Sequence, residues 1–229
     1  MHIDSNRLDN KVMPFEVRPM ISEDIKSVNM IEKNALSPLV APTSFSRELR
    51  NPRARYLISN IVEAKIEDKG ELQNFNSPNF PFVKKIWDTT RDLFDKKLKI
   101  KNNNQSIAGY IGTWFAADEA HIISVAVHSR FRGIGVGELL LLSGIEQASS
   151  LGAKKISLEV RVSNLIAQNL YKKYGFEIAN TRKGYYFDNR EDAYTMTRNE
   201  ISIDSDQMIL KGLADAHSFK WGKSNRRYY

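Results

Sequence analysis

The sequence predicts one mixed α/β (α+β) domain in which helices pack on a central mixed sheet. Segments rich in β-branched and aromatic residues alternate with segments whose apolar residues recur at helical spacing. Their order is one strand, two helices, three strands, a helix, a strand, a helix and two strands, a pattern typical of a sheet covered by helices. The chain of 229 residues is long enough to bury a sizeable core without disulfides or metals.

Proline and serine mark the first elements. Pro19 ends an alternating segment, and because proline cannot donate to a strand ladder we expect the first strand near a sheet edge. Ser22 is a candidate N-cap for the helix that follows. The apolar face of that helix is formed by Ile25, Val28, Ile31 and Ala35. The predicted elements are a strand at Phe15–Met20, helices at 23–34 and 45–50, and a strand at Ala54–Val62.

Residues of about 64–105 differ in character and predict an insertion. They contain the turn-forming segments EDKG, NFNSPNFPF and NNN. Between these segments, apolar residues at helical spacing predict one amphipathic helix, which we expect to pack on its own domain rather than on a partner. The residues of this helix are Phe82, Val83, Ile86, Trp87, Thr90, Leu93 and Phe94.

The remaining elements follow the insertion. They are strands at Ser106–Phe115 and Ala120–Val127 joined by a turn at 117–119, a helix at Val136–Leu151, a strand at Lys154–Val162, a helix at 164–175, and strands from Phe176 to Tyr186 and from Ala193 to Thr197. We expect the domain over residues 15–198, with terminal extensions at 1–14 and 199–229. The last segment ends KWGKSNRRYY; a basic aromatic tail can contact RNA, but a frayed terminus is the favoured interpretation.

Composition narrows the function. The chain has no Cys, which excludes disulfides, thiolate-bound metals and a cysteine nucleophile. A net charge of +7 is compatible with an anionic partner, but we attribute it to a basic surface and expect no nucleic-acid binding. The N-terminus lacks the apolar segment of a signal peptide, and no apolar run approaches the roughly 20 residues of a membrane span. We expect a cytoplasmic protein with no metal and no membrane partner.

The segment RFRGIGVGELLLL (residues 130–142) is the strongest chemical signal. A Walker A loop needs Lys-Ser/Thr after its last glycine, and a dinucleotide-binding fingerprint needs another glycine spacing, so both interpretations are weak. Glycines 133, 135 and 137 instead predict a strand–turn–helix junction whose free amides and helix dipole bind a phosphate. A tight turn with positive φ would explain one glycine; three glycines with flanking arginines favour anion binding.

Several segments together resemble a known family. They are SVAVHSRFRGIGVG (124–137), LEVRVSN (158–164), AQNLYKKYGF (167–176), and RKGYY with EDA (182–186 and 191–193). This pattern resembles the GNAT N-acetyltransferase superfamily and, within it, the RimI-type ribosomal-protein-alanine N-acetyltransferases. The resemblance is strong over 106–198, fair over 15–62, and absent over the insertion and the C-terminal tail. It implies the GNAT fold, with a mostly antiparallel sheet, and acetyl-CoA as the donor.

The resemblance also assigns the donor site. Arg130 and Arg132 both begin an R-x-x-G-x-G pattern, and the family's spacing from Val127 favours Arg132. In that register, the resemblance implies that Arg130 lies at the surface near the 3′-phosphate of CoA. The residues implied to contact acetyl-CoA are Val125, Ala126, Val127, Arg132, Gly133, Ile134, Gly135, Val136, Gly137, Glu138 and Asn164. Asn164 also opens a helix, so it is a candidate cap as well.

Glu159 and Tyr171 are the candidate catalytic residues. Glu159 alternates with two apolar neighbours, and if those face the core its side chain faces the cleft. A carboxylate is a suitable base for an α-ammonium, whose pKa is about 7.7–8, whereas the alternative is a surface ion pair with Arg161. Tyr171 aligns with the family's general acid, and its alternative is a core tyrosine. Tyr185 and Tyr186 are candidates for the acceptor groove or for packing on a strand face.

The leading hypothesis is therefore an N-α-acetyltransferase that modifies the N-terminal alanine of a small-subunit ribosomal protein. Without cysteine, direct attack in a ternary complex is the simplest mechanism. The alternatives are a GNAT enzyme with another acceptor (other protein N-termini, lysine or a small amine) and a non-catalytic acetyl-CoA- or ribosome-binding module. The oligomeric state is not predicted.

Overall fold

The computed structural model describes residues 12–36, 42–62, 107–201 and 204–229. The chain divides into two units, Met1–Val62 with Ser106–Tyr229, and Glu63–Gln105. Every element below belongs to the first unit. The helix expected within the insertion lies outside the described residues, as do residues 1–11 of the expected N-terminal extension.

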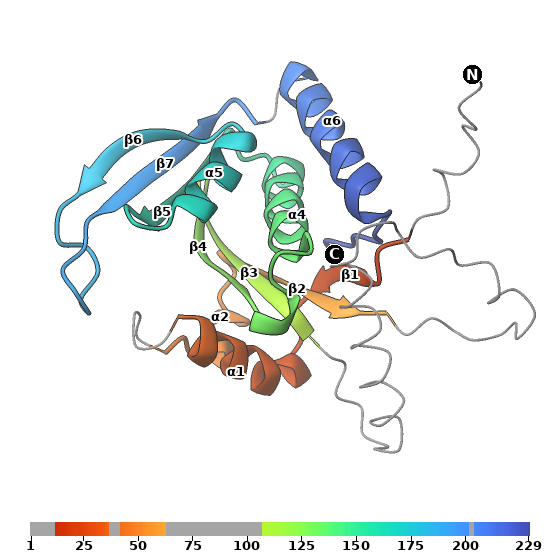
Figure 1. Cartoon of the computed structure of the whole chain (residues 1–229), viewed down its shortest axis with the longest axis horizontal. Helices are drawn as coiled ribbons and strands as arrows, with labels where there is room; N and C mark the ends of the chain where they lie inside the picture. Colours follow the sequence, from red (N-terminus) through yellow and green to blue (C-terminus); the bar gives the residue numbers. More distant parts are fainter. Residues whose placement is uncertain (1–11, 37–41, 63–106, 202–203) are drawn as a thin grey trace, which may run out of the picture. The chain divides into compact units, whose positions relative to one another are not determined.

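A seven-stranded mixed sheet forms the centre of this unit (Figure 1). The strand order is β1-β2-β3-β4-β5-β7-β6; β4 and β5 are parallel, and all other neighbours are antiparallel. This confirms the predicted mixed, mostly antiparallel sheet, with β1 at an edge. The strands are β1 Phe15–Pro19, β2 Ala54–Ile61, β3 Ile107–Ala116, β4 Glu119–Val127, β5 Lys155–Arg161, β6 Glu177–Arg182 and β7 Ala193–Asn199.

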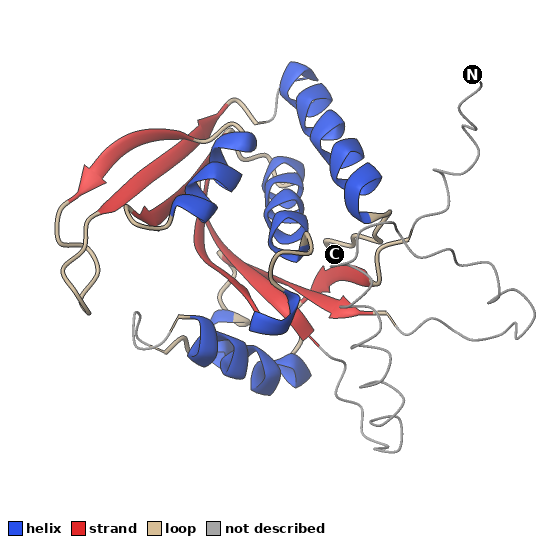
Figure 2. Ribbon diagram, in the orientation of Figure 1, coloured by secondary structure: helices blue, strands red, loops and turns tan. Residues whose placement is uncertain are grey.

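Helices cover both faces of the sheet, as Figure 2 shows. On one face, α1 (Ile25–Ala35) and α2 (Phe45–Glu48) bury Val28, Ile31 and Phe45 in one apolar cluster. On the other face, α4 (Val136–Ser150) and α5 (Leu165–Lys173) pack on a second, larger cluster. A further helix, α6 (Asp204–Trp221), packs against α4.

The first helix does not begin as expected. Ser22 lies in a 3-10 turn, Ser22–Asp24, and its side chain caps nothing, so its prediction as the N-cap is wrong. Asp24 takes that place: its carboxylate accepts a hydrogen bond from the Ile21 amide at 2.9 Å and pairs with Arg18 at 2.7 Å. Asp24 is thus the N-cap of α1 by its position, while its buried carboxylate binds the preceding loop and Arg18 rather than an amide of the helix.

The expectation of a frayed C-terminus is wrong. Residues 204–221 form α6, which buries Leu210, Ala214 and His217. The tail then runs parallel to β1, where the Met13 and Val17 amides each donate to a tail carbonyl at 2.8 Å. The reason lies in α4, whose four consecutive leucines (139–142) are all fully buried. A helix that is apolar all round needs cover on both sides, and α6 with the tail supplies the side away from the sheet.

Candidate active site

A turn rich in free amides joins β4 to α4. Gly133 and Gly135 have positive φ values of 77° and 86°, so two of the three glycines are explained by backbone conformation. Gly137 lies within the first turn of α4, where a Cβ would make only an ordinary 3.5 Å contact. Within the described part of the chain, no carbonyl or side chain accepts a hydrogen bond from the amides of residues 133–138, and the first helical bond runs from the Leu139 amide to the Gly135 carbonyl at 2.9 Å. These unpaired donors stand at the positive end of a helix and fit an anion.

The side chains of two charged residues in this turn bind other parts of the chain. The Arg132 side chain is exposed, and its Nε donates to the Val127 carbonyl at 3.1 Å, which ties the turn to the end of β4. The Glu138 carboxylate accepts from the Lys173 ammonium at 2.5 Å and from the Tyr174 hydroxyl at 3.1 Å. Burial would raise the pKa of Glu138, but the Lys173 hydrogen bond and charge lower it overall. The carboxylate is thus ionised yet paired, so it repels a bound anion little.

Next to this turn, β4 and β5 separate. Their parallel pairing covers only Glu119–Ile122 with Lys155–Leu158, although β4 continues to Val127 and β5 to Arg161. A register shift in β4 opposite Gly112 and Thr113 of β3 marks the point of separation. Such a bulge bends a strand away from its neighbour. The backbone of the predicted donor-binding strand, Val125–Val127, therefore has no β5 ladder on its open side.

Glu159 is the first residue of β5 beyond the paired segment. Its side chain is 11% exposed, and both carboxylate oxygens are engaged: Oε2 lies 3.0 Å from His121 Nε2, and Oε1 accepts from Arg182 Nη1 at 3.1 Å. His121 Nδ1 in turn lies 2.9 Å from the Ser157 hydroxyl. Because a carboxylate only accepts, a neutral His121 carries its proton on Nε2 and accepts from Ser157 at Nδ1. The alternative ion pair with Arg161 is wrong, since that guanidinium pairs with Asp188 and Glu191.

These contacts determine the charge state of Glu159. Burial alone would raise the pKa of this carboxyl, but the hydrogen bonds and charges of His121 and Arg182 lower it overall. The group is therefore ionised at neutral pH and able to accept a proton. His121 comes from β4 and Arg182 from β6, so three strands of the sheet hold one carboxylate.

Comparisons with known proteins show the family of this chain. Residues 69–176 match the model of the acetyltransferase (GNAT) family. A putative ribosomal protein bS18-alanine N-acetyltransferase of Bacillus subtilis is 35% identical over 181 residues, which cover 79% of this chain and 92% of that protein. This chain belongs to the GNAT acetyltransferase family.

A further relative and a solved structure are also similar to this chain. The ribosomal protein bS18-alanine N-acetyltransferase of Escherichia coli K12 is 37% identical over 95 residues, or 41% of this chain and 64% of that protein. The crystal structure of the ribosomal-protein-S18-alanine N-acetyltransferase from Escherichia coli has a TM-score of 0.57 and 22% identity, and the match covers 81% of this chain and 94% of that one. At this identity the structural match shows the fold alone. The family establishes that this GNAT chain is an acetyl-CoA-dependent N-acetyltransferase.

The remaining predicted site residues of this acetyltransferase lie on α5. Asn164 is the N-cap, and its Oδ1 accepts from the Ala167 amide at 3.2 Å, which confirms the capping role. Tyr171 packs its ring 5.9 Å from Phe176, as the core alternative predicted, and burial raises its pKa to about 12. The phenol is therefore protonated at neutral pH. Neither the contact of Asn164 with CoA nor the acid role of Tyr171 is tested by these contacts, and both stay predictions.

The two tyrosines of RKGYY lie in the turn between β6 and β7, so their prediction as strand residues is wrong. The Gly184 amide donates to Asp192 at 2.9 Å, and Gly184 has a φ of 56°, which ends the strand. Arg182 stacks on the Tyr185 ring at 4.4 Å, and Arg161 stacks on the Tyr186 ring at 3.7 Å.

This turn stands beside the candidate catalytic groups. Burial raises the pKa of Tyr186 to about 12, and the charges of Tyr171 and Glu159 both contribute to it. Arg182, which stacks on Tyr185, also binds Glu159, so the turn lies next to that candidate catalytic side chain. His121, Ser157 and Arg182 of this site were missed by the sequence reasoning. The register of parallel strands brings the first two together, and no local motif signals it.

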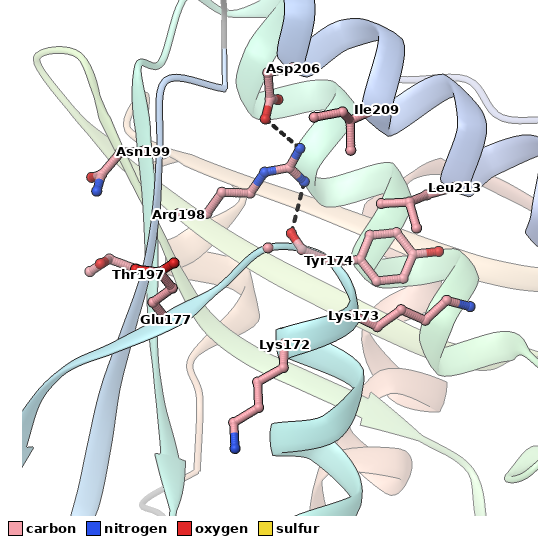
Figure 3. Close-up of a pocket in the computed structure, with 11 residues that line it drawn as sticks. Lys172, Lys173, Tyr174, Glu177, Thr197, Arg198, Asn199, Asp206, Ile209 and Leu213 are labelled. Atoms are coloured by element: carbon pink, nitrogen blue, oxygen red, sulfur yellow. Dashed lines mark hydrogen bonds and ion pairs between the residues drawn. The ribbon is translucent and has the colours of Figure 1, made fainter.

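A separate hollow lies among the end of α5, the strands β6 and β7, and α6 (Figure 3). None of the predicted site residues lines it. Its buried Arg198 donates to the Tyr174 carbonyl at 2.9 Å and to Asp206 at 2.7 Å, so it caps the end of α5 and ties α6 to it. These contacts of Arg198 stabilise the fold. Among the described residues, no helix is long and apolar enough to span a membrane, and no three His, Cys, Asp or Glu side chains gather as a metal site.

Proposed function

We propose that this enzyme transfers acetyl from acetyl-CoA to the N-terminal alanine of a small-subunit ribosomal protein. The names of the Bacillus and Escherichia relatives support this acceptor, and the Bacillus relative matches over nearly its whole length. We place the reaction in the cytoplasm, because the proposed acceptor is a ribosomal protein.

The observation that carries the acetyl-transfer part of the proposal is the position of Glu159. It stands where β4 and β5 begin to separate, and the same separation leads to the free amides of the glycine turn. A donor whose pyrophosphate lies on residues 133–138 would extend along the open side of Val125–Val127 toward the carboxylate. Asn164 Nδ2 remains able to donate to it, because only Oδ1 serves the helix cap.

We propose direct attack in a ternary complex, since the chain has no cysteine to carry an acetyl group. The acceptor nitrogen forms a bond to the thioester carbon, and a backbone N–H of the Val125–Val127 strand donates to the developing oxyanion. Glu159 accepts the proton that the nitrogen releases; attack makes this nitrogen far more acidic than the free α-ammonium. The C–S bond then breaks, and sulfur leaves as a thiolate that must gain a proton.

Tyr171 is proposed to serve the leaving sulfur. With a pKa of about 12 the phenol always has a hydrogen to donate at neutral pH. It is a weak acid against a thiol, whose ordinary pKa is about 8.5. Tyr171 is therefore expected to stabilise the sulfur first through a hydrogen bond, with proton transfer as the C–S bond breaks.

The test is incubation with acetyl-CoA and a panel of peptides that differ in their first residue, read by mass spectrometry. The panel includes the same peptides with a blocked N-terminus and an internal lysine. Acetylation of Ala-initiated peptides at the α-amine, without lysine product, is the expected result. Preference for lysine, for other N-termini or for a small amine would replace the acceptor but keep the enzyme class. Binding of acetyl-CoA without any product would favour a non-catalytic module.

A further inference from the structure

The C-terminal end of α6 lies against the glycine turn. His217 is 1% exposed, and its Nε2 lies 3.1 Å from the Gly135 carbonyl. Because a carbonyl only accepts, Nε2 carries the proton of the neutral imidazole. Burial, the largest influence, lowers the pKa of His217, which favours this neutral form. A buried side chain of α6 thus holds the residue at which α4 begins.

The ring of Trp221 packs against the same residue, Gly135. A Cβ added to Gly135 would lie 2.7 Å from both Cδ1 and Cγ of the Trp221 ring, closer than side chains approach. Gly133 has a similar positive φ, but its Cβ would meet nothing within 4 Å. Gly135 is therefore required for two reasons, its φ of 86° and the indole ring that fills its side-chain space.

The residues after Trp221 keep this end of α6 in place. The Gly222 amide donates to the Ser218 carbonyl at 2.8 Å, and the tail then pairs with the start of the chain. Arg226 binds Glu146 in the middle of α4 through two hydrogen bonds of 3.0 Å each. A paired guanidinium–carboxylate of this geometry gives a rigid link. α6 therefore contacts the N-terminus of α4, and the tail contacts the C-terminal half of α4.

We propose that His217 and Trp221 are positioning residues of the acetyl-CoA site. They hold the Gly135 turn in the conformation in which the amides of residues 133–138 face the pyrophosphate of the donor. The inference rests on the proposed role of that turn as the pyrophosphate site. By this inference, the C-terminal segment contributes to donor binding, although the family resemblance does not extend over it. Such residues affect the donor KM, and they leave the acceptor KM and the kcat at saturating donor unchanged.

Four variants test this. His217→Leu removes the donor to the Gly135 carbonyl, His217→Gln retains an N–H at a similar reach, and Trp221→Leu empties the space beside Gly135. Phe219→Leu on the same helix is the matched control, because this side chain is 70% exposed. We expect the KM for acetyl-CoA to rise about 5-fold in His217→Leu and Trp221→Leu, the loss that follows from one hydrogen bond or contact. His217→Gln should restore most of the affinity, and Phe219→Leu should match the wild type.

A shortened donor distinguishes a displaced glycine turn from a general loss of structure in the variants. With acetyl-pantetheine, which lacks the pyrophosphate, the variants should retain wild-type kcat/KM, whereas a structural defect would lower it for both donors and overturn the proposal. Thermal unfolding without ligand identifies a variant that does not fold; in that case Trp221→Phe and His217→Asn, whose amide is one methylene shorter than that of Gln, carry the comparison. Equal acetyl-CoA KM values for the wild type, His217→Leu and Trp221→Leu would also overturn it.

A further variant distinguishes the inference from the proposal on which it rests. Gly137→Asp adds a negative charge to the first turn of α4, next to the free amides, at a position where the Cβ has room. If this change weakens acetyl-CoA while the α6 variants do not, only the positioning role is refuted. If Gly137→Asp leaves acetyl-CoA affinity unchanged, the turn does not bind the pyrophosphate and both ideas are refuted.

Discussion

Alanine substitution of the glycines in the turn gives a graded series whose costs follow from the structure. Gly133→Ala adds a Cβ in open space but at a φ of 77°, which costs roughly 1–2 kcal/mol for a residue with a side chain. Gly135→Ala adds the same backbone cost and a 2.7 Å clash with the Trp221 ring, and overpacking of this kind costs about 1–3 kcal/mol more. Gly137→Ala, at a helical position with room, should stabilise by roughly 0.5–1 kcal/mol.

Thermal unfolding of the three variants measures this series. For a domain of about 150–250 residues, 1 kcal/mol corresponds to roughly 2–4 °C in Tm. Gly133→Ala should therefore lower Tm by about 4 °C, Gly135→Ala by about 10 °C, and Gly137→Ala should raise it by about 2 °C. In a Trp221→Ala background the loss for Gly135→Ala should fall to that of Gly133→Ala. Equal losses for the two substitutions in the wild-type background would refute the packing of Trp221 against Gly135.

Three further predictions concern the chemistry. Glu159→Gln should remove turnover by at least about 100-fold while acetyl-CoA binding survives; full activity at neutral pH would exclude this carboxylate as the base. His121→Leu removes a contact that lowers the pKa of Glu159, so that pKa rises and the acid limb of kcat/KM moves to higher pH; an unmoved limb in pH–rate profiles would contradict the coupling. Tyr171→Phe should lower kcat about 10- to 100-fold with little change in Tm, because the ring packing is retained; an unchanged kcat would leave Tyr171 with its packing role only.

Local signals predicted most of the elements. Each described strand and helix before residue 200 lies within a few residues of its expected position, because hydrophobic period and turn residues are local properties. The RKGYY segment was predicted as part of a strand that begins at Phe176. In the structure, the Gly184 amide donates a hydrogen bond to Asp192, 8 residues further on, and this contact closes a turn between the two strands.

The candidate site likewise contains residues that the sequence predicted and residues that it did not. The glycine turn, Glu159 and Asn164 were predicted because each belongs to a short motif with a chemical reason for its spacing. His121 lies in no such motif, and Arg182 belongs to the RKGYY segment but was assigned no role from it. They reach Glu159 because β4 pairs with β5 in the register His121↔Ser157, and because β7 lies between β5 and β6. Strand order and register depend on the packing of the whole sheet, so no window of sequence reveals them.

The sequence by itself determined the strand and helix types of most elements, the family and the amide-rich turn, and it predicted a carboxylate as the candidate base. These features depend on residue type and on the spacing of residues within short segments of the chain. Only the tertiary structure decided what surrounds them: the two donors on Glu159, the separation of β4 from β5, and the order of the C-terminal segment. The tail is polar and unremarkable by composition, and it becomes ordered because α4 presents four leucines that require cover. Burial of apolar surface is a property of the assembled chain, and it places His217 and Trp221 beside Gly135.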